Sequence, residues 1–318
     1  ATTSAATTTQ RTGPTGLSGT LVFQDGKGSI YLYELASGTQ RYLTNGFEPE
    51  ISRDGSKIAF TRYGDKPGLY TINRDGSGER QLYGTQTFVS SPKWNPAGDW
   101  LVFSRQSGEY KCFNLGSFLG CVTEARFCPF GFQCLPSELR TTKPEFMLAR
   151  VDQDGDNYRD LNSLNTALAP DWNESGIVYD AATTIEITQD TPDGETTQVI
   201  TGNWIQDADW QPDGGRIVYH QREGSHYEIF AVNTDGTGLV ALTKPVTTLV
   251  DNLPSNVAPA WSPDGQHIVY LSSRDEANDR GDWRIWVMNA DGSNQRPLPI
   301  DVDFDYGFAH EQMIGWGQ

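Results

Sequence analysis

The stretch VAPAWSPDGQHIVY, residues 257–270, decides the fold. It reads as an apolar strand, a Ser-Pro-Asp-Gly turn and a second strand, because turn residues between two apolar runs mark a hairpin. The second strand recurs along the chain as LVF (21–23), IAF (58–60), LVF (101–103), IVY (177–179), IVY (217–219) and IVY (268–270). Recurrence of this kind indicates a repeat architecture.

Each copy continues into a third strand, a polar turn and a short fourth strand, which together form a meander. The strand before the turn appears five times, as EPEIS, SPKWN, APDWN, DADWQ and APAWS, and a sixth version, HEQMIGWGQ, lies at the C-terminus. A C-terminal strand that completes the first sheet closes a ring and leaves no open blade edge. We therefore predict an all-β protein, a six-bladed β-propeller of four-stranded antiparallel blades over residues 19–318.

One position of the repeat holds a tryptophan in five copies, with Ile51 as the substitute in the sixth. Large aromatic side chains at equivalent positions are expected to form the core between adjacent blades rather than a binding site. The set is Trp94, Trp172, Trp210, Trp261 and Trp316.

The repeats PAWSPDGQHIVYLSSR, IWVMNADGSNQRPL, EISRDGSKIAF and DADWQPDGGRIVYHQ resemble the WSPDG-type, PD40-like repeats of TolB-like propellers, over residues 19–316. The resemblance implies the fold and a bacterial protein. It leaves the function open, because such repeats occur in transport accessory proteins, peptidase and lyase propellers, and sensor domains of membrane kinases.

The formal net charge of -17 argues against a nucleic-acid partner, since phosphate binding needs clustered Lys and Arg. An anionic membrane surface is excluded on the same ground. No apolar run approaches the roughly 18 to 20 residues of a membrane-spanning helix, so we expect no membrane insertion.

All four cysteines lie in one insertion, residues 106–143, and lack the paired spacing of structural zinc sites. Two disulfides are expected, with the three pairings left open, so we predict an extracellular, cell-surface or periplasmic protein. The cysteines are Cys112, Cys121, Cys128 and Cys134.

The meander sorts its loops onto two faces, which we name the connector face, where each inner strand begins, and the turn face, which carries the Asp-Gly turns. The insertion falls on the connector face, where we expect a partner to bind. Its aromatic residues predict an interaction surface, or alternatively a small core of its own: Phe118, Phe127, Phe130 and Phe132.

Two groups of polar residues are candidate ligand sites. Asp301, Asp303 and Asp305 alternate, so an extended chain presents them together to water or to calcium. The positions just before the tryptophans line a channel that is either simply wet or able to hold a small ligand: Glu50, Lys93, Asp171, Asp209, Ala260 and Gly315. We place His310 and Glu311 at the connector-face mouth of the same channel.

No hydrolase or metalloprotease motif occurs, so we assign no catalytic residue, expect no enzyme and require no cofactor. The leading hypothesis is an exported protein-interaction or structural module. The Thr-rich tail, residues 1–18, could donate a β-strand and assemble the chain into oligomers or filaments. The alternatives are the ligand-sensing domain of a membrane receptor such as a bacterial kinase, and a lyase or hydrolase with a channel metal near His310.

Overall fold

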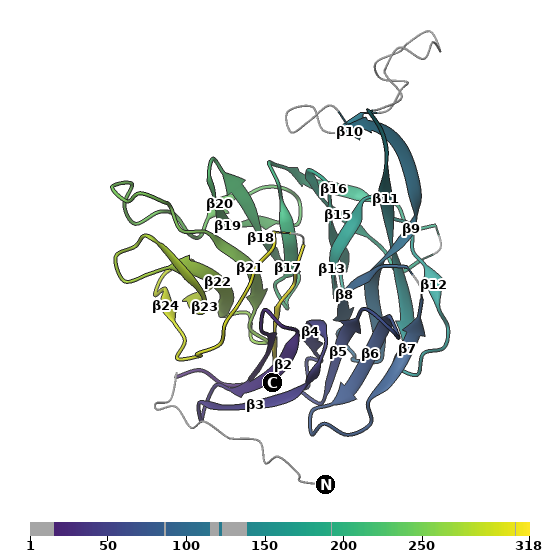
Figure 1. Ribbon diagram of the computed structural model, residues 1–318, viewed down its shortest axis with the longest axis horizontal. Helices are drawn as coiled ribbons and strands as arrows, with labels where there is room; N and C mark the ends of the chain where they lie inside the picture. The colour runs from purple at the N-terminus through teal and green to yellow at the C-terminus, as the bar shows by residue number, and fades with distance from the viewer. Residues whose placement is uncertain (1–15, 86, 115–120, 123–138, 192, 309) are drawn as a thin grey trace.

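The computed structural model of the protein describes residues 16–318 except 86, 115–120, 123–138, 192 and 309. Six antiparallel sheets surround a central axis, each with its first strand innermost (Figure 1). The prediction of a six-bladed β-propeller is therefore confirmed. No helix in this described part of the chain is long and apolar enough to cross a membrane.

The blades follow one another in chain order. Blade 1 contains β25 (Ile314–Gly317), β1 (Thr20–Gln24), β2 (Ser29–Glu34) and β3 (Thr39–Asn45). Blade 2 contains β4 (Phe47–Ile51), β5 (Lys57–Arg62), β6 (Gly68–Asn73) and β7 (Arg80–Gly84). Blade 3 contains β8 (Val89–Trp94), β9 (Trp100–Asn114), β11 (Arg140–Asp152) and β12 (Arg159–Asp160), with β10 (Cys121–Val122) paired to β9.

The second half of the ring repeats this order. Blade 4 contains β13 (Ala167–Asn173), β14 (Gly176–Ala181), β15 (Thr184–Thr188) and β16 (Thr197–Thr201). Blade 5 contains β17 (Gln206–Trp210), β18 (Arg216–Glu223), β19 (His226–Asn233) and β20 (Val240–Ala241). Blade 6 contains β21 (Asn256–Trp261), β22 (His267–Arg274), β23 (Arg280–Asn289) and β24 (Arg296–Pro297).

The ring is closed by pairing between the two ends of the chain. β25 runs antiparallel to β1, with Leu21 opposite Trp316 and Phe23 opposite Ile314. The indole Nε1 of Trp316 also donates to the Ser18 carbonyl oxygen at 3.1 Å. The predicted closure of the first blade by the C-terminal strand is thus confirmed.

The hydrophobic core lies between neighbouring blades. Six apolar clusters each combine residues from two adjacent blades, as when Val218 and Ile229 of blade 5 pack with Trp261 and Ile268 of blade 6. The structure places one member of the repeated tryptophan position, or Ile51, in each of these clusters: Ile51, Trp94, Trp172, Trp210, Trp261 and Trp316.

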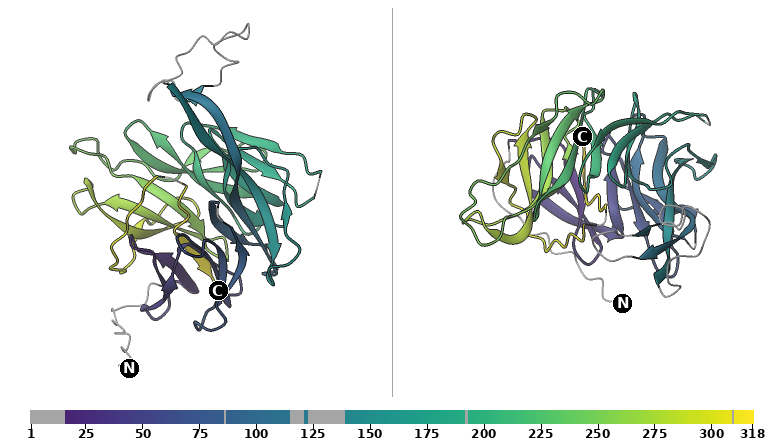
Figure 2. Two further views of the ribbon diagram at one scale, coloured as in Figure 1. Left: turned by 45° about the vertical axis from the view of Figure 1, so that its right-hand side comes forward. Right: turned by 90° about the horizontal axis from the view of Figure 1, so that it is seen from above.

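Blade 3 departs from the regular meander. Its second and third strands, β9 and β11, extend over 15 and 13 residues and project beyond the ring as a long ribbon, seen in Figures 1 and 2. The sequence predicted an insertion at residues 106–143 but not that both of its ends continue the blade strands. Alternating polar and apolar residues in EYKCFN were the available signal for this extension.

A β-bulge occupies the same position in five inner strands. The register shifts there, and the bulged residue has a positive φ of 44 to 56° although it is not glycine: Glu48, Ser91, Ala169, Asp207 and Ala258. Bulges re-aim side chains, and strained backbone of this kind clusters at functional sites. Five of them therefore form a ring around the axis.

Replacing a tryptophan between blades should cost far more stability than replacing an exposed one. Trp261→Ala removes a side chain that is 4% exposed, and it should lower the free energy of unfolding by about 3 to 5 kcal/mol. Trp204→Ala, at a side chain 54% exposed, should cost about 0.5 kcal/mol or less. Denaturant titration of both variants checks this, and equal losses would contradict the placement of the core between the blades.

Candidate functional site

The central channel has two tiers of side chains, both supplied by the inner strands. The tier near the turn face contains the six residues that precede the tryptophan position. The tier near the connector face contains the bulged residues, two positions earlier in each strand. The bulge interrupts the usual alternation of side chains between the two positions. Glu48 of blade 2 and Asp207 of blade 5 nevertheless lie close enough for Asp207 to raise the pKa of Glu48, which places both side chains toward the axis.

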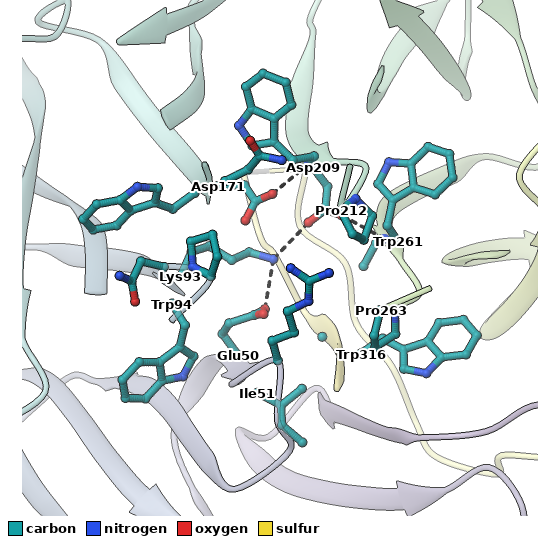
Figure 3. Close-up of a pocket in the computed structure, with 18 residues that line it drawn as sticks. Glu50, Ile51, Lys93, Trp94, Asp171, Asp209, Pro212, Trp261, Pro263 and Trp316 are labelled. Carbon is teal, nitrogen blue, oxygen red and sulfur yellow. Dashed lines mark hydrogen bonds and ion pairs between the residues drawn. The ribbon is translucent and has the colours of Figure 1, made fainter. Parts of the chain in front are cut away.

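The turn-face tier is a charged cluster at the bottom of a cavity of about 100 Å³ (Figure 3). Lys93 Nζ lies 2.9 Å from Glu50 Oε2 and 3.2 Å from Asp209 Oδ1. The second oxygen of Asp209 accepts the Trp261 backbone N–H at 2.8 Å. Tryptophans and three prolines from the Asp-Gly-type turns form the wall: Trp94, Pro96, Trp172, Trp210, Pro212, Trp261, Pro263 and Trp316.

Charges in this tier compensate one another. Burial raises the pKa of Glu50 to about 7, against the opposing effect of Lys93. Burial and the neighbouring Asp209 raise the pKa of Asp171 to about 7. Burial alone would lower the pKa of Lys93, but the surrounding carboxylates outweigh it and raise that pKa. We interpret the tier as a structural ion cluster that links blades 2, 3 and 5.

Close approach explains the glycine in this ring. A Cβ atom on Gly315 would lie 2.8 Å from Glu50 Oε2 and 3.2 Å from Val22 Cγ1. A side chain at this position would therefore push Glu50 away from Lys93.

Removing the charge of Asp171 should increase the stability of the folded protein most at high pH. The pKa of Asp171 is raised from 3.8 to about 7, so the folded state keeps a proton that the unfolded state releases, and this group lowers stability as pH rises through that window. Asp171→Asn keeps an oxygen to accept the Trp210 N–H, a bond of 2.7 Å.

Thermal melts at about pH 5 and about pH 8 should show the Tm of the variant gaining on wild type by about 2 °C or more at the higher pH. Asp251→Asn, at an exposed position, is the control and should show no such trend. A Tm difference that stays constant with pH would contradict the raised pKa.

Two of the five bulged residues in the connector-face tier are acidic, Glu48 and Asp207. Glu48 Oε2 accepts the Ser91 N–H at 2.8 Å and the Thr61 hydroxyl at 3.2 Å. Burial raises the pKa of Glu48 to about 7. Burial and the nearby Asp180 carboxylate raise the pKa of Asp207 to about 7 as well. No lysine or arginine is among the side chains that we describe in this tier.

A long connector between β24 and β25, residues 298–313, enters this tier, and Figures 1 and 2 show it near the centre of the ring. Hydrogen bonds hold its backbone to more than one blade. The Asp303 carbonyl oxygen accepts the Gly26 N–H at 2.9 Å, and the Phe308 carbonyl oxygen accepts an N–H of Gln206 Nε2 at 3.3 Å. His310 Nδ1 lies 2.8 Å from Asp180 Oδ2. Burial lowers the pKa of His310, but the contact with Asp180 outweighs it, so the net pKa is raised.

A second polar network surrounds Asp207. The Tyr306 hydroxyl donates to Asp207 Oδ2 at 2.7 Å and lies 3.5 Å from His220 Nε2. Burial holds the pKa of His220 well below its usual value, so this imidazole is neutral. The other carboxylate oxygen, Asp207 Oδ1, is buried without a hydrogen-bond partner among the described residues.

Several large apolar side chains are exposed on the connector face. Each lies on a connector between two blades, and Leu249 is 94% exposed: Phe88, Leu164, Trp204, Val246 and Leu249. Next to them, Tyr63 stacks on Phe88 with ring centroids 5.5 Å apart, and its hydroxyl reaches Glu48 Oε2 at 3.5 Å. The connector face thus carries exposed apolar side chains and an acidic channel, which meet at Phe88 and Tyr63.

The structure brings together some of the predicted site residues and separates others. Glu50, Lys93, Asp171 and Asp209 share the turn-face tier, while His310 lies in the connector-face tier, with Glu311 close enough to raise the pKa of Asp207. Asp301, Asp303 and Asp305 are exposed and alternate with the buried Phe304 and Tyr306. No group of three or more potential metal ligands occurs among the described residues, and calcium binding stays a prediction.

Several predictions fall on residues outside the described part. These are the surface of Phe118, Phe127, Phe130 and Phe132, the cysteines Cys128 and Cys134, and residues 1–15 of the N-terminal tail. The disulfides, the interaction surface of the insertion and self-assembly through the tail therefore remain predictions. Cys112 is buried near the end of β9, and Cys121 begins β10.

Sequence reasoning missed most of the connector-face tier. Glu48 and Asp207 stand two residues before the ring that the repeat alignment identified, in EPE and DAD, and the alignment could have found them. Asp180 and His220 each follow an IVY triplet directly, which was a second usable signal. Gln206 and Tyr306 carried no pattern that separates them from ordinary strand and loop residues.

Comparison with known sequences gives relatives named as peptidases. No known protein-family profile matches the chain. It is 30% identical over 272 residues to dipeptidyl-peptidase 5 of Porphyromonas gingivalis, covering 78% of this chain and 38% of that protein. It is 32% identical over 87 residues to the uncharacterized peptidase YuxL of Bacillus subtilis, covering 26% of this chain and 13% of that protein. The chain therefore spans well under half the length of either relative.

Comparison with solved structures shows the fold. TolB from Acinetobacter baumannii superimposes with a TM-score of 0.65 at 14% identity, covering 96% of this chain and 67% of that one. Acylaminoacyl peptidase from Pyrococcus horikoshii gives 0.52 at 14% identity, over 86% and 41% of the two chains. An oligogalacturonate lyase in complex with manganese gives 0.51 at 17% identity, over 85% and 70%. The fold is that of TolB-like six-bladed propellers, and membership of the WSPDG repeat family stays a prediction.

These comparisons contradict the expectation that the chain is not an enzyme. The sequence relatives are named as peptidases, and the structural neighbours include a peptidase and a lyase. The expectation rested on the absence of hydrolase motifs from the sequence. The repeat pattern of a propeller, however, identifies its fold and not its function. Catalytic groups that the fold assembles from separate blades leave no local motif.

Proposed function

We propose that this propeller is a peptide-binding module that takes a basic segment of a partner protein on its connector face. The observation that carries the proposal is the set of exposed apolar side chains on the connector face, where Phe88 stacks on Tyr63 and the Tyr63 hydroxyl reaches Glu48 of the acidic channel. Large apolar side chains exposed together mark interaction surfaces, and TolB-like propellers offer such a surface at the end of a rigid ring. The peptidase names of the sequence relatives support a peptide as the ligand class.

Charge supports a basic rather than an acidic segment. The chain carries a formal charge of -17, and three of its acidic residues, Glu48, Asp207 and Glu311, lie together in the connector-face channel. Acidic clefts raise the local concentration of cations and speed their association. An acidic peptide would meet repulsion at the same place.

Selection of random short peptides displayed on phage tests this proposal. Peptides that combine basic residues with leucine or aromatic residues should be enriched. Leu249→Ser should weaken the selected peptides about tenfold, as expected when one buried leucine side chain is lost. Leu239→Ser is the matched control, because this leucine is 52% exposed on the turn face, and it should leave the affinity unchanged.

Isothermal titration of wild type and both variants with one selected peptide gives the measurement. Failure to enrich any peptide would contradict the proposal. So would an affinity that falls with Leu239→Ser and survives Leu249→Ser.

A second candidate function is general acid–base catalysis on the bound peptide. Its support is the Asp180–His310 pair, because a carboxylate on Nδ1 orients an imidazole and fixes its tautomer. Mass spectrometry of the selected peptides after incubation would show cleavage that disappears in His310→Gln. Peptides that stay intact with wild type would remove this candidate and leave the binding proposal standing.

A further inference from the structure

Two buried acceptor oxygens in the connector-face tier have no hydrogen-bond partner among the described residues. One is Asp207 Oδ1, on a residue that is 1% exposed, and the other is Gln312 Oε1, on a residue that is 8% exposed. The Gln312 amide nitrogen is placed 3.4 Å from the Ala169 oxygen, and Ala169 is the bulged residue of the blade next to Asp207. A buried acceptor without a donor is costly, so a ligand that supplies N–H groups would be stabilised by these two oxygens.

The surroundings of these oxygens select for positive charge. Asp207 and Glu311 lie close enough to Glu48 to raise its pKa, and Asp180 of the neighbouring blade and Glu311 raise the pKa of Asp207. His310 contacts Asp180 and also acts to lower the pKa of Asp207 and Glu311, but one imidazole faces four carboxyl groups. A neutral donor would leave the remaining carboxylates uncompensated in a buried site.

The pattern of occupied oxygens selects for an ammonium over a guanidinium. Asp207 Oδ2 is engaged by the Tyr306 hydroxyl, and Glu48 Oε2 by Ser91 N–H and Thr61. Neither carboxylate therefore presents two unengaged oxygens to the fork of an arginine. An ammonium group has three N–H donors that point in different directions, so it can bind single oxygens from separate residues. A metal ion is a poorer fit, since the described residues hold no group of three metal-ligating side chains.

We propose that the connector-face tier binds the ammonium group of a lysine side chain, with Asp207 Oδ1 and Gln312 Oε1 as direct acceptors. This inference rests on the proposed peptide binding and names the side chain that enters the channel. The aromatic row of Phe47, Tyr63 and Phe88 lies beside Glu48 and can pack along the lysine stem.

The test compares four versions of one selected peptide, with its N-terminus acetylated: the parent with lysine, and copies with norleucine, arginine or acetyl-lysine in its place. Wild type should bind the lysine version about tenfold or more tightly than each of the others, as for a charge-assisted hydrogen bond. A parent that binds only with a free N-terminus would overturn the lysine assignment.

Asp207→Asn is the informative variant. Asparagine tolerates the positive φ of 56° at this position and can still accept from Tyr306, so the fold should be retained. The variant should bind the lysine and norleucine peptides about equally. Asp171→Asn, the matched carboxamide change in the turn-face tier, should keep the lysine preference.

A second variant guards against misfolding. Gln312→Met removes the other acceptor at similar size, and it should reduce the lysine preference of the protein while the circular dichroism stays native. If norleucine and lysine peptides bind wild type equally, the lysine site is wrong and peptide binding stands. If no version of the peptide binds, the proposed function fails with it.

Discussion

Closure of the ring by β25 against β1 is the constraint on which the rest of the structure depends. Each blade buries one face against the blade before it and the other against the blade after it, so an open ring would expose two apolar faces. Pairing of the two chain ends removes both. An ion pair supports this joint, because Arg74 of blade 2 lies 2.6 Å from Glu34 of blade 1 and also donates to Thr20 of the closing sheet.

Closure also brings six equivalent strand positions to one axis, and this creates the channel. The two tiers differ in how their charges are satisfied. In the turn-face tier, one lysine bridges two carboxylates, and a third carboxylate accepts a backbone N–H, so the cluster is complete within the chain. In the connector-face tier, two of the bulged residues are acidic, and two buried oxygens have no donor within the described part of the chain. The first tier links blades, and the second is the tier suited to receive a ligand.

The sequence predicts the fold well and the site only in part. The repeated Pro-Asp-Gly turn and tryptophan define the blades, and alignment on Trp94 and its equivalents also locates the turn-face ring. The same alignment also places Glu48 and Asp207 at one position, two residues earlier, but it does not reveal the bulge there, because a bulge adds one residue without changing the local composition. The alternation of Asp301, Asp303 and Asp305 was real, but it reflects burial of Phe304 and Tyr306 on the opposite side. The repeat pattern identifies the fold but carries little information about catalysis. The prediction that the chain is not an enzyme was wrong for that reason.

Hydrogen–deuterium exchange of the protein with and without a lysine-containing selected peptide tests the account most directly. Bound peptide should slow exchange in the connectors at residues 202–205 and 242–255, which lie on the connector face, and in the segment 306–313, which enters the channel. Slowed exchange at the turns of residues 95–99, 211–215 and 262–266 would place the ligand on the turn face. That result, or no change in either region, would contradict the claim that the connector face and its channel tier form the binding site.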